Sequence, residues 1–212
     1  MIYPFLSWES CSSIFAEDPN ECVYEYAGDI LNEEESGKQT RIGKFRAYYI
    51  DVERSMNERI SLSDVLDAHS QETFDYFDAI FGENSPEFSD AVDQLLNSDI
   101  FQTNLLILDR LELLPRYRGD LLGLKIMAHM ITRFSPGAGV VAIKPYPLQL
   151  EDADASDDEW RSKLLLDKFQ SEEKLSTEAL INYYGKLGFE VLPETPYMVL
   201  STSKQLADFE ET

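Results

Sequence analysis

The spacing of hydrophobic and polar residues predicts a chain whose second half is more regular than its first. The N-terminal stretch mixes aromatic and acidic side chains without a clean period, and only a short strand around 22–30 is expected there. Residues 41–52 alternate and are rich in Phe, Tyr and Ile, which predicts a strand. Apolar residues at helical spacing predict helices over 62–81 and 85–96. We therefore expect an irregular N-terminal half with a helical segment or insertion at 53–103.

The second half of the chain carries a clearer pattern. Residues 103–114 form a nearly continuous apolar run, which is typical of a strand buried on both faces. An amphipathic helix is expected over 121–134, and a second buried strand over 139–146. A strand, a crossover helix and a strand imply a parallel pair with a right-handed connection. The remaining predicted elements are one or two helices within 160–187 and closing strands at 189–192 and 197–200.

Together these elements predict an α/β (α+β) protein with a central mixed sheet and helices on both faces. The 212 residues, 43% of them hydrophobic, suffice for one domain over 1–212 with a sizeable core. Residues 151–160 are rich in carboxylates, but their spacing does not match a calcium loop, so we expect a solvated acidic loop and no metal site.

The formal net charge of −22 limits the classes of partner. Nucleic acid and anionic membrane surfaces would be repelled, whereas cationic partners and amines would be attracted. No apolar run has the length that a bilayer crossing needs, and the apolar N-terminus lacks the basic flank of a secretory signal. A cytoplasmic protein is therefore expected.

One segment of the second half carries a net positive charge. Residues 110–144 contain six basic residues against two acidic ones, within a strongly acidic chain. In this segment the buried strand leads through a short turn into a helix, with Arg116 and Arg118 at the helix start. Unpaired N–H groups and the positive dipole end make a helix N-terminus an anion site. Gly119 lets the backbone approach such a ligand closely.

Two motifs of this region resemble the GNAT superfamily of acyl-CoA-dependent N-acyltransferases. Arg116, Gly119 and Leu121 occupy the positions of the family's Arg/Gln-x-x-Gly-x-Gly/Ala signature, and Gly123 matches a further frequent glycine. Downstream, residues 184–189 resemble the closing Tyr-x-x-Leu-Gly-Phe motif. The resemblance covers about 105–201 and implies a GNAT-like sheet whose strand before the loop splays from its parallel neighbour.

The resemblance also implies a cofactor site for acetyl-CoA, used as a co-substrate. The backbone of Leu113 and Leu114 would bind the pantetheine arm. The diphosphate would be held by the loop residues Arg116, Tyr117, Arg118, Gly119, Asp120, Leu121, Leu122 and Gly123.

The same resemblance implies a catalytic role for Tyr184, as the general acid for the departing thiolate. A tyrosine is protonated at neutral pH and can donate that proton. A base must also accept the ammonium proton. Glu112 and Asp109 are the candidates, and alternation along a strand would place them on opposite faces. Glu112 is preferred, although an ion pair with Arg110 explains it equally well.

The sequence thus favours an N-acyltransferase acting on an amine-bearing small molecule or protein. A second hypothesis is a GNAT-like module that has lost catalysis and binds a basic partner through its acidic surface. Leu121 stands where a small residue is usual, and Thr177 where an asparagine is usual, and both favour this second hypothesis. Mimicry of nucleic acid by the acidic surface is a third, and a homodimer stays open.

Overall fold

The computed structural model describes residues 3–10, 19–82, 85–97, 100–151 and 158–207. The strands of these residues form one sheet of seven, in the order β1-β2-β3-β4-β5-β7-β6. Their bounds are β1 Pro4–Glu9, β2 Val23–Glu33, β3 Gln39–Ile50, β4 Asn104–Leu113, β5 Ala138–Ile143, β6 Glu190–Val191 and β7 Met198–Ser201. Only β4 and β5 pair in parallel, and the other neighbours pair antiparallel. The predicted mixed sheet is confirmed.

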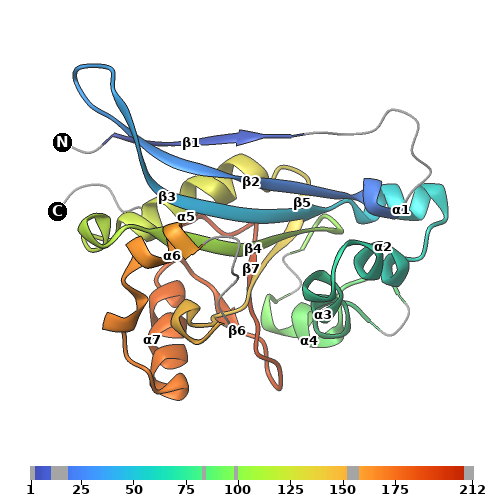
Figure 1. Ribbon diagram of the computed structural model, residues 1–212. Coiled ribbons are helices and arrows are strands. Elements are labelled where there is room, and N and C mark those ends of the chain that lie inside the picture. The colour runs from blue at the N-terminus through green and yellow to red at the C-terminus, as the bar shows by residue number, and fades with distance from the viewer. Residues whose placement is uncertain (1–2, 11–18, 83–84, 98–99, 152–157, 208–212) are drawn as a thin grey trace.

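The helices other than α5 gather at the two ends of the molecule, and α5 lies against the middle of the sheet (Figure 1). One group follows β3, and α6 and α7 lie at the other end beneath the sheet. The bounds are α1 Val52–Glu58, α2 Leu62–His69, α3 Gln71–Ile80, α4 Asp90–Leu95, α5 Leu122–Phe134, α6 Asp158–Leu164 and α7 Glu173–Gly185. Within the described residues, no helix is both long and apolar enough to pass through a lipid bilayer.

The N-terminal half is more regular than the sequence pattern predicts, because β1, β2 and β3 form a continuous antiparallel meander. The prediction of a single helix over 62–81 is wrong, because the helix is interrupted at Ser70. Ser70 has an extended backbone, and its hydroxyl accepts a hydrogen bond from the Thr73 amide to start α3. The expected acidic loop at 151–160 lies largely outside the described residues, which omit 152–157.

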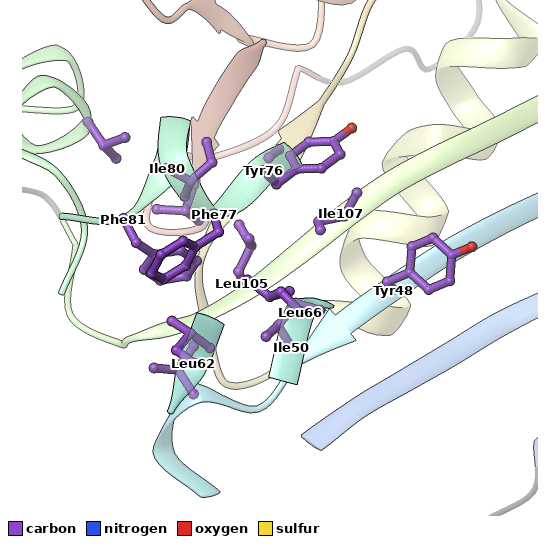
Figure 2. Close-up of a cluster of buried hydrophobic side chains, with 14 of the residues drawn as sticks. Tyr48, Ile50, Leu62, Leu66, Tyr76, Phe77, Ile80, Phe81, Leu105 and Ile107 are labelled. Carbon is purple, nitrogen blue, oxygen red and sulfur yellow. The ribbon is translucent and has the colours of Figure 1, made fainter. Parts of the chain in front are cut away.

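Two hydrophobic clusters, one on each face, hold the sheet between helices. On one face, α2 and α3 bury Leu66, Phe77 and Ile80 against Ile50 and Ile107 of the sheet (Figure 2). On the other face, α5 packs its apolar stripe against the inner side chains of β3, β4 and β5. Helices on both faces, as predicted, explain why the central strand β4 is almost wholly apolar until it reaches its last five residues.

Candidate functional site

The parallel strands β4 and β5 separate before β4 ends. Their pairing stops at Leu108 opposite Ile143, and β4 continues for five more residues to Leu113. The chain after β5 contains Pro145 and Pro147, and proline cannot donate to a strand ladder. This also explains why β5 is shorter than the predicted strand at 139–146. The last part of β4 therefore loses its neighbour on one side.

The open side of β4 presents backbone polar groups. Leu114 donates its N–H to the carbonyl of Ile42 at 2.9 Å, which makes these two residues a hydrogen-bonded pair with β3. In an antiparallel pair, bonded and non-bonded positions alternate. The N–H and C=O groups of Leu111 and Leu113 therefore point away from β3, toward the space that β5 has left.

That space is a cavity of about 470 Å³, here called the apolar cavity. Its walls come from the end of β4, from α5 and from α7, and the segment between α6 and α7 covers it. The lining is mostly aliphatic and aromatic, and includes Met127, Met130, Ile143, Leu164, Leu166, Phe169, Ala179 and Leu180. An extended, largely apolar ligand with amide groups could pair with the β4 edge inside such a cavity.

A β-bulge sits in β4 where the two strands separate. Arg46 of β3 is opposite Arg110, and Ala47 is opposite Leu108, so Asp109 is an extra residue without an opposing partner. An extra residue shifts the alternation of the strand by one. Asp109 and Glu112 consequently line the same polar cleft, and the prediction that they lie on opposite faces is wrong.

The polar cleft has a volume of about 970 Å³ and opens on the α3 side of the sheet. Its walls carry charges of both signs from β2, β3, β4, α3 and α6. Six residues line both the polar cleft and the apolar cavity, namely Asp109, Arg110, Glu112, Lys144, Tyr146 and Leu148. The two spaces therefore meet across the bulged end of β4.

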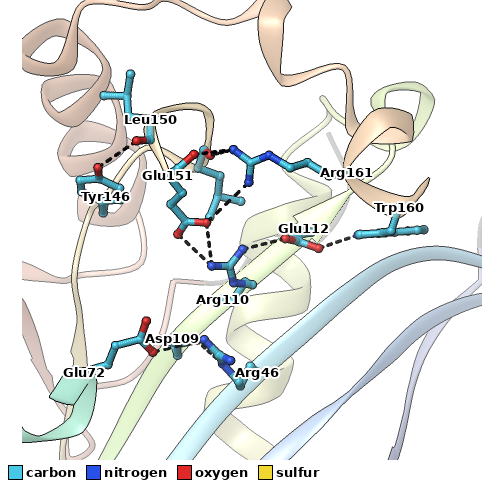
Figure 3. A network of polar contacts seen from close by, with 11 residues as sticks. Arg46, Glu72, Asp109, Arg110, Glu112, Tyr146, Leu150, Glu151, Trp160 and Arg161 are labelled. Atoms are coloured by element: carbon cyan, nitrogen blue, oxygen red, sulfur yellow. Dashed lines mark hydrogen bonds and ion pairs between the residues drawn. The ribbon is translucent and has the colours of Figure 1, made fainter. Parts of the chain in front are cut away.

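Glu112 is the buried centre of an ion network in this region (Figure 3). The residue is 7% exposed, and its carboxylate accepts from the indole N–H of Trp160 at 2.6 Å and from Arg110 at 3.0 Å. Arg110 also donates twice to Glu151, at 2.7 and 2.8 Å. Burial alone would lower the pKa of Arg110, but its hydrogen bonds to these two carboxylates and their negative charge raise it. Because both Glu112 oxygens are engaged, the contacts favour the ion-pair interpretation over a base.

Asp109 belongs to a second set of contacts. Its carboxylate pairs with Arg46 at 2.5 Å, and Arg46 also reaches Glu72 of α3 at 3.3 Å (Figure 3). Asp109 has 15% of its side chain exposed, and the residue lines both the cleft and the cavity. Asp109 therefore lies where the two spaces meet.

The loop at 116–123 lies between two hollows. Arg118 and Gly119 line both the apolar cavity and a separate hollow of about 420 Å³ beside β1, and Gly123 lines only the cavity. Arg116, Tyr117, Asp120 and Leu122 line only the hollow beside β1. Of the described residues predicted to bind a cofactor, Leu114 and Leu121 line neither space, whereas Leu113 lines the cavity. The structure thus brings only part of the predicted set to the β4 edge.

Two side chains of the loop bond within the protein. The guanidinium of Arg118 donates to the carbonyls of Leu113 and Leu164, each at 2.8 Å, and lies over the Phe169 ring. Arg116 bonds to the Tyr117 hydroxyl. Burial lowers the pKa of Arg118. Arg118 therefore joins the end of β4 to the segment that covers the cavity.

Leu121 begins α5 in a left-handed conformation, with φ of 57°, and its side chain makes no capping hydrogen bond. The hydroxyl of Tyr183, from α7, lies over the first turn of α5 instead. It stands 2.6 Å from where a Cβ on Gly123 would be. Sequence reasoning did not single out Tyr183, because its partner helix is about 60 residues away.

Tyr184 lines the apolar cavity together with Leu113, Gly119 and Gly123. Burial raises its pKa above the ordinary value for tyrosine, so it remains protonated at neutral pH. His69 packs edge-on against Tyr48, 4.9 Å between ring centres, and lines none of the three spaces. In the described part of the chain, no three His, Cys, Asp or Glu residues gather in a way that could hold a metal ion.

No family model, no curated protein and no solved structure matches the chain. Function must therefore be argued from the site itself. The site offers an apolar cavity with an open strand edge, a phenol held protonated, and a charged cleft that meets the cavity.

Proposed function

We propose that this protein is an acyl-CoA-dependent N-acyltransferase of the GNAT type, which transfers an acetyl group directly from acetyl-CoA to an amine. The observation that carries the proposal is the junction of the apolar cavity with the polar cleft at the bulged end of β4. A donor and an acceptor can approach such a junction from opposite sides. A cytoplasmic location, where acetyl-CoA is available, goes with this proposal.

The donor side is argued from the β4 edge. The pantetheine arm is extended and carries two amides, so the backbone groups of Leu111 and the N–H of Leu113 could pair with it as an added strand would, while the Leu113 carbonyl accepts from Arg118. The sequence resemblance implies a strand that splays from its parallel neighbour before the loop, and the divergence of β4 from β5 supports this. Gly119 and Gly123, which also line the cavity, lie where the arm would lead to the diphosphate.

The acceptor side is argued from the charges of the polar cleft. Its α3 wall carries Glu72 and Asp75, and Asp109 adds a carboxylate at the junction. An ammonium group would be attracted to this wall. The net charge of −22 would bias a cationic substrate toward the protein at long range.

The chemistry requires two proton movements. The amine nitrogen forms a bond to the thioester carbonyl carbon, the carbon–sulfur bond breaks, and the thiolate takes a proton from Tyr184. The amine loses its proton to a carboxylate, directly or through a water molecule. Both Asp109 and Glu112 line the junction, but Glu112 uses both oxygens in other bonds, whereas Arg46 contacts only one oxygen of Asp109, so Asp109 is the better placed base.

The test combines binding and turnover. Acetyl-CoA should bind in calorimetry, and a panel of amines should release thiol from it. Tyr184→Phe should slow turnover about a hundredfold while changing affinity for acetyl-CoA less than about twofold. Tyr49→Phe is the matched control, since its hydroxyl bonds to Asn104 far from the cavity. Absence of binding at millimolar acetyl-CoA would reject the proposal.

A second candidate function is a GNAT-like module without catalysis, whose acidic surface binds a basic partner. The observation that favours it is that the chain's own groups occupy ligand positions. Arg118 bonds to the Leu113 carbonyl, and the Tyr183 hydroxyl covers the first turn of α5. Acetyl-CoA binding without thiol release across the amine panel, together with salt-sensitive capture of a basic peptide, would favour this candidate.

A further inference from the structure

Lys144 follows β5 at the point where β4 and β5 separate. The last parallel pair joins Leu108 to Ile143, so Asp109 and Lys144 are the next residues on the two strands. Neighbouring strands lie about 5 Å apart at such a pair. Both Asp109 and Lys144 line the polar cleft and the apolar cavity. A carboxylate and an ammonium group therefore stand on either side of the junction between the two spaces.

Lys144 differs from the arginines of the polar cleft in its partners. Each of the four arginines pairs with a carboxylate, namely Arg41 with Asp29, Arg46 with Asp109, Arg110 with Glu112 and Arg161 with Glu151. No carboxylate that the structure describes pairs with Lys144, and its ammonium lies 5.9 Å from the centre of the Tyr146 ring. That distance is at the limit of a cation–π contact, so the ring holds the ammonium weakly. The Lys144 side chain is exposed and can reach a ligand at the junction.

The two charges at the junction are kept apart by the contacts of Asp109. Its carboxylate pairs with Arg46 of β3, and β3 lies on the side of β4 away from β5. Lys144 continues from β5, so the space where the strands separate lies between the two charges. The carboxylate suits the ammonium of an acceptor, and the Lys144 ammonium suits an anionic group next to it.

We propose that Lys144 determines the specificity for the acceptor, which is an α-amino acid whose carboxylate pairs with the Lys144 ammonium. This inference rests on the proposed function. An α-amino acid carries its amine and its carboxylate on one carbon atom, which fits opposite charges on adjacent strands. The nitrogen forms the bond to the acetyl carbon, coenzyme A leaves as the thiol, and the carboxylate is unchanged. The carboxylates of Glu72 and Asp75 on the α3 wall favour a basic side chain, as in free L-arginine.

Matched acceptors test whether Lys144 recognises the carboxylate. L-arginine and agmatine differ only in the α-carboxylate, and each has one nucleophilic amine. Lys144→Gln should lower kcat/KM for L-arginine about tenfold, mainly through KM, because a charge-assisted bond to the substrate is lost. The value for agmatine should change less than about twofold. Lys144→Arg keeps the charge and should restore kcat/KM for L-arginine to within about threefold of the wild-type value.

Lys38→Gln is the matched control. Lys38 is exposed between β2 and β3 and lines none of the three spaces, and its replacement removes the same charge from the chain. Turnover of both acceptors should be unchanged in this variant. In calorimetry, acetyl-CoA should bind the wild-type protein, Lys144→Gln and Lys38→Gln equally, because the inference concerns the acceptor alone. Any other α-amino acid that is acetylated is compared with its decarboxylated amine in the same way.

The outcomes separate the inference from the proposed function. If amines are acetylated but no common α-amino acid is, the inference fails and the function stands. An equal loss for L-arginine and agmatine in Lys144→Gln would also overturn the inference, since Lys144 would then not recognise the carboxylate. If no acceptor releases thiol from acetyl-CoA, the proposed function fails and the inference fails with it. A loss confined to the α-amino acid and restored by Lys144→Arg would support the inference.

Discussion

The ion network around Glu112 can be tested by removing its central carboxylate. Glu112→Ala would leave the buried indole N–H of Trp160 without its acceptor, now bonded at 2.6 Å. An unsatisfied buried donor costs about 1–3 kcal/mol. Arg110 would keep Glu151 at 2.7 Å, so the full cost of about 3–5 kcal/mol for an orphaned buried charge is not expected. We expect a loss of about 3 kcal/mol in the free energy of unfolding.

A conservative variant separates the two contributions. Glu112→Gln keeps an oxygen for Trp160 but places an amide NH2, a donor, opposite Arg110, so the ion pair and its hydrogen bond are lost and the loss should be about 1–2 kcal/mol. The matched control is Glu58→Ala. This change breaks the exposed ion pair between Glu58 and Arg54, which lies one turn earlier on the same helix. Such pairs contribute about 0.3–0.5 kcal/mol. The essential prediction is the order of the losses in free energy of unfolding: Glu112→Ala should lose most, Glu112→Gln less, and the control Glu58→Ala least.

Urea unfolding followed by tryptophan fluorescence and circular dichroism measures these losses. The chain has two tryptophans, Trp8 and Trp160, so fluorescence also reports directly on the altered contact. A loss of about 3 kcal/mol should lower the melting temperature by about 6–12 °C in a protein of this size. If Glu112→Ala costs no more than Glu58→Ala, the network does not stabilise the fold and our reasoning is refuted.

Two further predictions concern the core and alkaline pH. Leu106→Ala should cost about 3–4 kcal/mol in urea unfolding, since Leu106 is fully buried in the central strand, and a cost below about 1 kcal/mol would contradict close packing there. Burial raises the pKa of Tyr197 to about 12, above the value of about 10 in an unfolded chain, so its contribution to stability is complete below about pH 10 and is lost as pH rises toward 12. Between about pH 9 and 12, the free energy of unfolding should fall less in Tyr197→Phe than in the wild-type protein. An equal fall in both proteins would show that Tyr197 does not cause the loss of stability at alkaline pH.

The elements that the sequence predicts best are those with a strong local signal. The apolar runs at 103–114 and 139–146 and the helix at 121–134 each carry their own pattern, and β4, β5 and α5 match them closely. β1 gave no such signal, because it is an edge strand and the structure leaves none of its residues fully buried. The alternation of apolar and polar side chains arises where one face of a strand is buried. An edge strand without a buried face does not need this alternation.

The candidate site shows a sharper limit. Alternation along β4 separates Asp109 from Glu112, and one extra residue in the bulge reverses that result. Nothing in the local sequence marks the bulge, since it depends on the register with β3. The partners of Glu112 and Arg110 come from Trp160 and Glu151, about 40 to 50 residues along the chain. Such contacts follow from tertiary packing, which periodicity does not encode.

The bulge at Asp109 and the separation of β4 from β5 can be understood as one feature. An extra residue bends a strand and increases its local twist. The pairing with β5 ends at Leu108, immediately before the bulge, and the open edge at Leu111 and Leu113 begins just after it. The same extra residue turns Asp109 toward the face that carries Glu112. The bulge accounts for the carboxylates that would face an acceptor, and together with Pro145 and Pro147 after β5 it accounts for the edge that would bind a donor.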